Sequence, residues 1–326
     1  MFSVFMYAFN ALAPILILIL LGFQLKKREF LTDGFLEVGN KLMFRISLPA
    51  MLFVSVYSGV ESLSDIKWSI VIFALVMIAV IFVLGLVAAL LFIPDRKQKG
   101  VVLQCSFRSN FAIIGLVLAD GLGGSSAVAV VGILSAFSVT LFNVLAVISL
   151  TVFSDNKTFD IKNIIRGIIT NPLIIGILSG VVALAFKNVF PVDKNLKFLY
   201  SAFETLGKLA TPLALIVLGG RFTFKAGAGM LKQIAIATIM RIVVAPFIAL
   251  GLAVILTKLG VVNFGTSEFP ALIALFATPV AVSSAVMAAE MKSDAVLADQ
   301  LVVWTSVFSV ITIFIFIVAL RSLEMI

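Results

Sequence analysis

The sequence predicts an all-α membrane protein with ten transmembrane helices in two inverted five-helix repeats. Hydrophobic residues make up 62% of the 326-residue chain and charged residues 12%, whereas a soluble domain is about 45–50% apolar and about 25% charged. Ten apolar stretches approach the roughly 20 residues that a helix needs to cross a bilayer. Short patterns from the first half also recur in the second half. The composition excludes a soluble enzyme and a nucleic-acid binder, and the single cysteine, Cys105, excludes a disulfide scaffold.

The ten apolar stretches are separated by short polar connections that leave no room for a soluble domain. The first lacks a basic leading segment and is of full length, so we expect a spanning helix rather than a cleaved signal peptide. The predicted spans are Val4–Leu25, Leu36–Tyr57, Trp68–Phe92, Val101–Ala119, Val128–Phe153, Ile164–Phe186, Phe198–Gly219, Ile234–Leu256, Phe269–Met291 and Leu301–Leu320.

Lysine and arginine are distributed unevenly between the two sides of the predicted membrane. Connections after odd-numbered spans carry thirteen of the 24, those on the other side carry six, and five lie within spans. Cytoplasmic loops are the richer ones in membrane proteins. The sequence therefore predicts a multi-pass protein of the cell membrane with both termini outside, and this asymmetry explains most of the net charge of +8.

Three short patterns occur in the same order in both halves and predict an internal repeat. They are Pro14 with Gly22 and Pro172 with Gly180, Arg45 with Pro49 and Lys208 with Pro212, and Phe-Ser-Val at 137–139 and 308–310. The predicted division is a first repeat at 1–153, a cytoplasmic connector at 154–163 and a second repeat at 164–326. Because five is odd, the second repeat enters the membrane from the opposite face, and such inverted repeats are typical of secondary transporters.

Polar residues and proline interrupt the fourth and ninth spans, which hold equivalent places in the two repeats. Proline inside a helix removes a backbone hydrogen bond, and unwound backbone at membrane depth is tolerated where it lines a cavity. Half-helix N-termini at such breaks favour an anion. We therefore predict a substrate site here, although a simple kink and interhelical hydrogen bonds are the alternative. The candidate residues are Arg108, Ser109, Asn110, Thr278, Pro279, Ser283 and Ser284.

The same motifs resemble those of a known family. The motifs are Arg108-Ser109-Asn110 followed by Gly115-Leu116, Ala277-Thr278-Pro279 followed by Ser283, Ser284, Met287, Ala288 and Glu290, Leu48-Pro49-Ala50, and Asn171-Pro172-Leu173. Over essentially the whole chain they are similar to the auxin efflux carrier family, which includes plant PIN auxin transporters and bacterial malate and malonate permeases. The resemblance implies that helices 4 and 9 are discontinuous and cross at their breaks. The short centre of the chain resembles the compact bacterial members.

Charged residues within the spans divide into candidate functional groups and surface groups. Arg45 lies near the predicted bilayer centre and joins the candidate site, whereas Lys41 and Arg241 lie near a cytoplasmic end, from which a long side chain can reach water. Asp120 and Glu290 end the two interrupted spans. They are candidates for binding a coupling proton or cation, with solvated helix ends as the alternative.

These observations predict a secondary active or facilitative transporter, not an enzyme, that moves a small organic anion by alternating access. The resemblance implies a dicarboxylate such as malate or malonate. The alternatives are an amphipathic carboxylate that is auxin-like or bile-acid-like, and a non-transporting membrane receptor. The expected partners are the anion, the lipid bilayer and a coupling H+ or Na+. The sequence does not decide between a monomer and a homodimer, and no nucleic acid is expected. Without histidine, and without phosphate-loop or hydrolase motifs, the sequence predicts no cofactor and no metal site.

Overall fold

The computed structural model describes the chain except for residue 1 and residues 59–66, 155–168, 224–226 and 228. The described residues form helices and one isolated β-bridge, and they contain no strand. Within these residues, six helices are long and apolar enough to cross a membrane. They are Asp33–Ser58, Trp68–Phe92, Ser126–Val152, Lys197–Arg221, Leu231–Lys258 and Ala295–Ser322.

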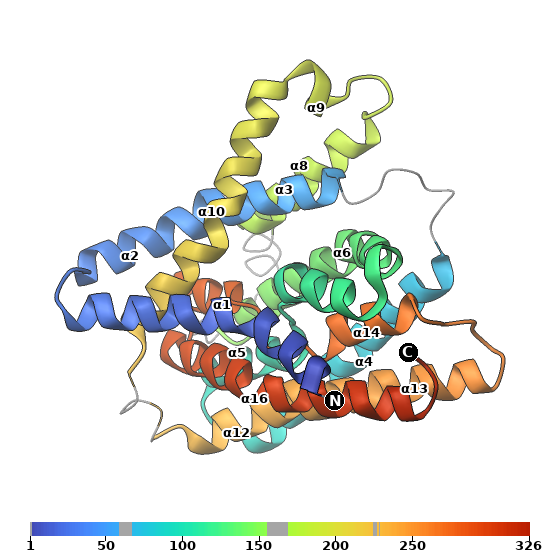
Figure 1. Ribbon diagram of the computed structural model, residues 1–326. Coiled ribbons are helices and arrows are strands. Elements are labelled where there is room, and N and C mark those ends of the chain that lie inside the picture. The colour runs from blue at the N-terminus through green and yellow to red at the C-terminus, as the bar shows by residue number, and fades with distance from the viewer. Residues whose placement is uncertain (1, 59–66, 155–168, 224–226, 228) are drawn as a thin grey trace.

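The helices pack as two layers (Figure 1). The first layer consists of α1 (Phe2–Lys27), the continuous run α2 (Asp33–Leu42), η1 (Met43–Ser47) and α3 (Leu48–Ser58), α8 (Pro172–Ala185), α9 (Val192–Asn195) and α10 (Lys197–Arg221). The second layer consists of α4 (Trp68–Phe92), α5 (Arg96–Phe107), η3 (Phe111–Gly115), α6 (Leu116–Val152), α12 (Leu231–Ile239), η4 (Met240–Val244), α13 (Ala245–Lys258), α14 (Glu268–Phe276), α15 (Ser283–Glu290) and α16 (Ala295–Ser322).

Glycines allow the helices of the first layer to approach backbone to backbone. A Cβ atom added to Gly22 of α1 would lie 2.1 Å from the carbonyl oxygen of Ile216 in α10, and one added to Gly219 would lie 2.0 Å from that of Ile19. Between α8 and α3, a Cβ atom on Gly176 would lie 2.6 Å from the carbonyl oxygen of Pro49. Close approach through small residues is a common mode of packing between membrane helices, and here it joins α1 to α10 and α8 to α3.

The second layer surrounds two interrupted helices. The pair α5 and α6 is interrupted between Phe107 and Phe111, and the pair α14 and α15 is interrupted between Phe276 and Ser283. Helix α6 has a further kink at Gly124, where φ is +62°. The residues of α14 are all buried, because α6 and α13 pack against them. The outer faces of α4 and α13 carry exposed apolar side chains such as Leu91 and Phe247, as expected for surfaces that contact lipid.

The helical class, the membrane character and the two interruptions agree with the sequence predictions. The helix that contains the start of the predicted fourth span, α5, begins five residues earlier at Arg96, with the side chain of Asp95 as its N-cap. The first residues of the predicted span Ile164–Phe186, up to 168, lie outside the described residues. Within the described part, the helix α8 begins at Pro172. The connector predicted at 154–163 also falls almost wholly outside them. The count of ten membrane-crossing helices and their inverted arrangement stay predictions.

Candidate functional site

The two interruptions lie against each other in the centre of the second layer. The backbone nitrogen of Asn110 donates to the carbonyl oxygen of Pro279 at 2.8 Å, and that of Ala281 donates to the carbonyl oxygen of Arg108 at 3.3 Å. These bonds form an isolated antiparallel bridge between Ser109 and Val280. The bridge satisfies backbone groups that the helix ends leave free. The breaks are therefore a bonded crossing point of two polypeptide segments, which we call the crossover.

Arg241 holds the C-terminal ends of both half-helices. Its guanidinium donates to the carbonyl oxygens of Phe107 at 2.8 Å, of Thr278 at 3.0 Å and of Leu275 at 3.3 Å, and also to that of Phe276. The side chain is fully buried. The expectation that Arg241 reaches water is therefore wrong. Helix C-termini carry partial negative charge, so the buried cation finds its compensation at two of them rather than in solvent.

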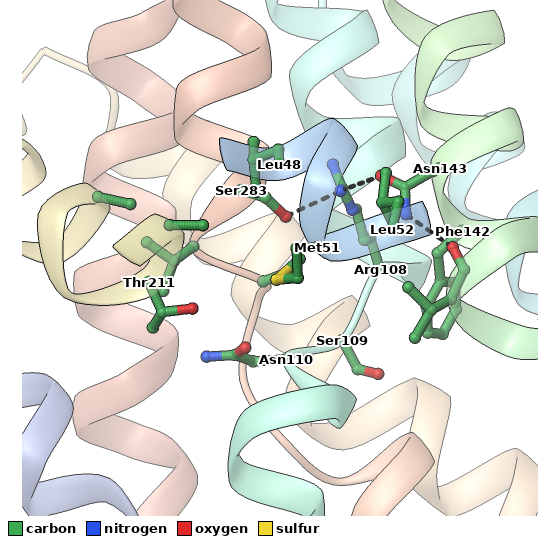
Figure 2. A pocket seen from close by; sticks show the side chains of 15 residues that line it. Leu48, Met51, Leu52, Arg108, Ser109, Asn110, Phe142, Asn143, Thr211 and Ser283 are labelled. Carbon is green, nitrogen blue, oxygen red and sulfur yellow. Dashed lines mark hydrogen bonds between the residues drawn. The ribbon is translucent and has the colours of Figure 1, made fainter. Parts of the chain in front are cut away.

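A small cavity of about 50 Å³ lies beside the crossover, between the two layers (Figure 2). The first layer contributes side chains of α3 and α10, and the second contributes both crossover segments and one face of α6. The lining is mostly apolar, and this volume has room for a few water molecules. The lining residues are Leu48, Met51, Leu52, Arg108, Ser109, Asn110, Val139, Phe142, Asn143, Ala210, Thr211, Ala214, Ala281, Val282 and Ser283.

Arg108 is the cation of this cavity, and it is only 3% exposed. Its guanidinium donates to Oδ1 of Asn143 at 2.6 Å, to Oγ of Ser283 at 2.8 Å and to the sulfur of Met287. All three acceptors are uncharged, and no ion pair of Arg108 occurs within the described part of the chain. A buried charge without a counterion is costly, so the site can stabilise a negatively charged group.

Two further polar groups at the cavity have no hydrogen-bond partner. They are the side-chain nitrogen of Asn110 and the hydroxyl of Ser109, and both side chains are about 95% buried. Figure 2 shows the Asn110 amide below Arg108 and Ser283, on the same side of the crossover as Thr211. Buried polar groups are nearly always satisfied in proteins. These two donors are therefore free to bind the oxygens of a ligand.

A comparison with family models identifies the class of the protein. The model described as "Membrane transport protein", which covers the auxin efflux carriers, matches residues 7–317. The chain belongs to this family. A comparison with curated proteins finds no match. The membrane transport family agrees with the apolar helices and with the resemblance that the crossover motifs carry.

Other predicted site residues of this transport protein lie near the crossover but not on the cavity wall. The Thr278 hydroxyl donates to the carbonyl oxygen of Ala274 within α14, and the Pro279 carbonyl belongs to the bridge. Ser284 is buried with an unpartnered hydroxyl, and its carbonyl accepts from the side chain of Gln104. Thr278 and Pro279 therefore shape the crossover backbone, whereas Ser283 faces Arg108 directly.

The remaining predicted residues lie farther away. Arg45 is exposed on η1 and lines a second cavity of about 520 Å³ toward α2, which we call the vestibule; Glu290 also lines it. Asp120 is exposed on α6, in the part that precedes the kink. The structure thus brings together Arg108, Ser109, Asn110 and Ser283 of the predicted set, and separates Arg45, Asp120 and Glu290 from them.

Sequence reasoning missed two polar residues of the transport protein's cavity. Asn143 accepts a hydrogen bond from Arg108, and its own side-chain nitrogen donates to the carbonyl oxygen of Val139 one turn earlier. Thr211 lines the opposite wall on α10. Asn143 is the one amide side chain in the predicted span Val128–Phe153, and a strongly polar residue inside a span is a signal that points to the interior. Thr211 carries no such signal, because threonine is common in membrane helices.

Proposed function

We propose that this protein is a secondary transporter that moves a small organic anion by alternating access, with its substrate site at the crossover. One observation carries the proposal: the buried guanidinium of Arg108 has only uncharged partners, and the same cavity is lined by Asn110 and Ser109, whose side-chain donors have no partner. A carboxylate bound in this cavity would supply the missing negative charge and accept from the free Asn110 amide. Family membership supports transport as the activity.

Hydrogen bonding at the crossover supports an inverted repeat. If residues 171 positions apart are equivalent, as the two Phe-Ser-Val patterns imply, Ser109 corresponds to Val280. These two residues pair with each other in the antiparallel bridge. The bond from Asn110 to Pro279 then corresponds to the bond from Ala281 to Arg108. A two-fold axis through the crossover would relate the bonds in this way, as in transporters with inverted repeats.

Helix packing in the first layer supports the same repeat independently. Gly22 approaches the carbonyl oxygen of Ile216, and Gly180 approaches that of Phe53, where an added Cβ atom would lie 2.9 Å away. Gly22 and Gly180 are 158 positions apart, and Phe53 and Ile216 are 163 apart. The two proline–glycine patterns and the two patterns of a basic residue with proline have these same offsets. The packing supports ten spans divided into repeats at 1–153 and 164–326, joined by a connector at 154–163.

The position of the cavity supports a motion between the two layers. Its walls come from both layers, and at about 50 Å³ it is too small for an organic anion. The vestibule lies toward α2, and a pocket of about 240 Å³ that shares Met51 and Thr211 with the cavity lies toward the other end of α3. A rocking of one layer against the other would open the site alternately to these two sides.

The substrate class has two candidates. The family resemblance and the uncompensated Arg108 favour a small dicarboxylate such as malate or malonate. The mostly apolar walls, including Leu52, Phe142 and Val139, favour an amphipathic carboxylate that is auxin-like as the second candidate. Arg108 and Asn110 would bind the carboxylate in both cases, whereas the apolar walls would bind only the amphipathic remainder.

Uptake into proteoliposomes tests the proposal. Labelled malonate and labelled malate are offered to the purified protein, with an unlabelled indole carboxylate as competitor. Uptake above that of empty vesicles supports the transporter, and strong competition by the indole compound favours the amphipathic substrate. Saturable binding without flux would identify a receptor instead. Uptake by Asn110→Ala should be reduced, whereas Asn195→Ala on α9 should transport as the parent does, because Asn195 is exposed and remote from the cavity.

A further inference from the structure

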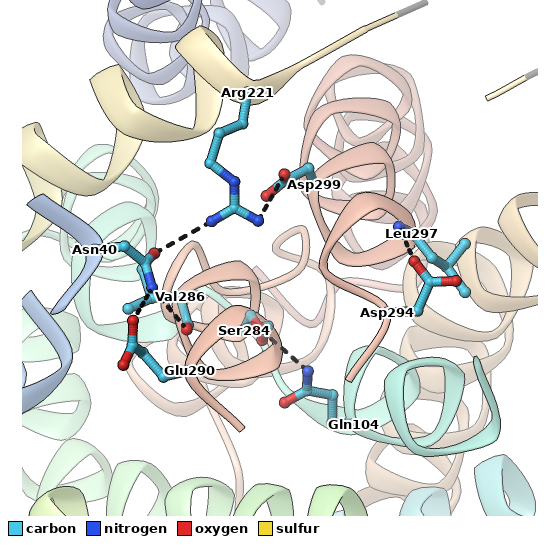
Figure 3. Close-up of polar contacts among 9 residues, drawn as sticks. All are labelled: Asn40, Gln104, Arg221, Ser284, Val286, Glu290, Asp294, Leu297 and Asp299. Carbon is cyan, nitrogen blue, oxygen red and sulfur yellow. Dashed lines mark hydrogen bonds and ion pairs between the residues drawn. The ribbon is translucent and has the colours of Figure 1, made fainter. Parts of the chain in front are cut away.

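Polar side chains connect the two layers at the vestibule end of the interface. They are Asn40 of α2 and Arg221 of α10 in the first layer, and Glu290 of α15 and Asp299 of α16 in the second. We call these four residues the interlayer cluster (Figure 3). Any motion that separates the layers at this end must break the contacts of the cluster. Its chemistry therefore bears directly on when this end of the interface opens.

Asn40 and Arg221 form one continuous polar chain across the interface. The side-chain nitrogen of Asn40 donates to Oε1 of Glu290 at 2.9 Å and to the carbonyl oxygen of Val286 at 3.4 Å. Its side-chain oxygen accepts from Arg221 at 3.3 Å. Asn40 is only 3% exposed. The Asn40 amide therefore accepts from Arg221 of the first layer and donates to Glu290 of the second, and so connects these two residues.

Asp299 is the acid of the cluster that lacks full compensation. It is 3% exposed, and its Oδ2 atom lies 3.2 Å from Nη2 of Arg221. Its Oδ1 atom is buried without a hydrogen-bond partner. A buried carboxylate is usually paired and fully hydrogen-bonded, and Asp299 has one such contact to a side chain that itself lines the water-accessible vestibule. A proton arriving from the vestibule has a free oxygen to bind.

Two charges act on Asp299. They are the attractive Arg221 from α10 and the repulsive Asp294 at the start of α16, while Glu290 of α15 faces it across Arg221 and Asn40. Charges on other helices that pack against α16 have partners of their own: Lys26 of α1 pairs with Asp33, Glu268 of α14 pairs with Lys67, and Arg241 of η4 bonds backbone carbonyls. The other cations on these neighbours include Lys27 of α1, Lys97 and Lys99 of α5, Lys232 of α12, and Arg96 of α5, which bonds the carbonyl oxygens of Val152 and Ser154. Arg221 is thus the direct counterion of Asp299.

We propose that Asp299 binds a proton that releases Arg221 and thereby opens the vestibule end of the interface. This proposal rests on the proposed transport function and names its coupling ion as H+. With the carboxylate charged, the ion pair holds α16 to α10. When the proton binds Oδ1, the carboxyl group becomes neutral and the charge attraction across the layers is lost. Since the open form then binds the proton more tightly, lower pH favours opening, by at most about tenfold per pH unit for one proton.

Cysteine labelling tests the proposal without any substrate. Ala289 lines the vestibule, and the native Cys105 is buried. From about pH 8 to about pH 5, a membrane-impermeant thiol reagent is applied to the predicted cytoplasmic side, and its labelling rate at Ala289→Cys is compared with its rate at Arg28→Cys, an exposed reference on the same side. The ratio should rise several-fold as the pH falls. In Asp299→Asn the ratio should be high and independent of pH, and Arg221→Gln should give the same result.

Two control variants and a separate uptake measurement distinguish the proposal from its alternatives. Asp299→Glu keeps a titrating acid and should restore the pH dependence, which distinguishes proton binding from a folding defect in Asp299→Asn. Glu268→Gln alters a buried, ion-paired acid within one layer and should leave the dependence intact. The proposal is overturned if Asp299→Asn retains the parent's pH dependence, or if the parent shows none. Malonate or malate uptake is measured separately, so a protein that opens with pH but transports neither compound would refute the proposed function alone.

Discussion

The backbone nitrogen of Asn110 donates to the carbonyl oxygen of Pro279, while the side-chain nitrogen of Asn110 has no partner. The first bond fixes the position of Asn110 relative to the second interrupted helix. The second observation leaves a preorganised donor at the wall of a cavity. A binding group held by its backbone pays little additional ordering entropy when a ligand binds. This arrangement supports the proposal that Asn110 binds a substrate rather than serving only as a contact between helices.

Replacing Asn110 by alanine should weaken substrate binding. A lost hydrogen bond to a charged oxygen is worth about 1.5–3 kcal/mol, which corresponds to roughly a ten- to hundredfold loss of affinity. The measurement is the dissociation constant of labelled malonate or malate for the purified variant. Asn195→Ala should bind as the parent does. Parental binding by a folded Asn110→Ala would remove the crossover from the candidate sites.

Replacing Arg108 by glutamine should weaken the binding of dicarboxylates more than that of monocarboxylates. The variant keeps hydrogen-bond donors toward Asn143 and Ser283 but loses the charge that attracts a dianion. The ratio of the two dissociation constants, measured at one ionic strength, reports the effect. Arg108→Lys keeps the charge and should fall between the parent and Arg108→Gln. An unchanged ratio in Arg108→Gln would show that this cation does not meet the substrate's carboxylates.

Replacing Arg241 by leucine should prevent stable folding. Four carbonyl oxygens would lose their donor in a buried environment, and each unsatisfied buried group costs about 1–3 kcal/mol. Monodispersity in detergent and the thermal unfolding midpoint measure the loss. Arg45→Leu removes another arginine from a predicted membrane span, but an exposed one. It should leave the monodispersity and the unfolding midpoint nearly unchanged. A well-folded Arg241→Leu would mean that the crossover does not depend on this guanidinium.

Replacing Gly219 by valine should separate α1 from α10. Even a Cβ atom would lie 2.0 Å from the carbonyl oxygen of Ile19, and overpacking in a tight core costs about 1–3 kcal/mol or more. We expect a lower thermal midpoint and a lower yield of folded protein. Gly251→Ala on α13 is the control, because its added Cβ atom would meet no atom within 4 Å. Equal midpoints for Gly219→Val and the parent would contradict the close packing of the first layer.

Cysteines at Arg28 and at Asn195 should be labelled from opposite sides of the membrane. Both positions are exposed, one after α1 and one in α9, and the uneven distribution of lysine and arginine predicts that the first lies in the cytoplasm. An impermeant thiol reagent applied to intact cells should reach Asn195→Cys, and it should reach Arg28→Cys only after permeabilisation. If both react in intact cells, the topology of ten spans with external termini is wrong.

The sequence by itself determined the membrane character, the helical class, the family and the location of the two interruptions. Each of these depends on local composition: long apolar runs require helices in a bilayer, and Pro279 cannot continue a helix without losing a hydrogen bond. The residues beside the interruptions, Arg108, Ser109, Asn110 and Ser283, were predictable for the same reason. The proposed repeat also rests on short sequence patterns, whose offsets match contacts between the helices.

Only the tertiary structure decided what the buried charges contact. Arg241 and Arg45 are both arginines within apolar runs, yet one bonds the ends of two half-helices and the other is exposed on the vestibule. Asp299 and Arg221 lie 78 positions apart in the sequence and meet because α10 and α16 belong to facing layers. Hydropathy reports how deep a residue lies in the membrane but not which neighbour it finds there. Long-range pairing depends on how helices pack, and that information is not contained in any single segment of the chain.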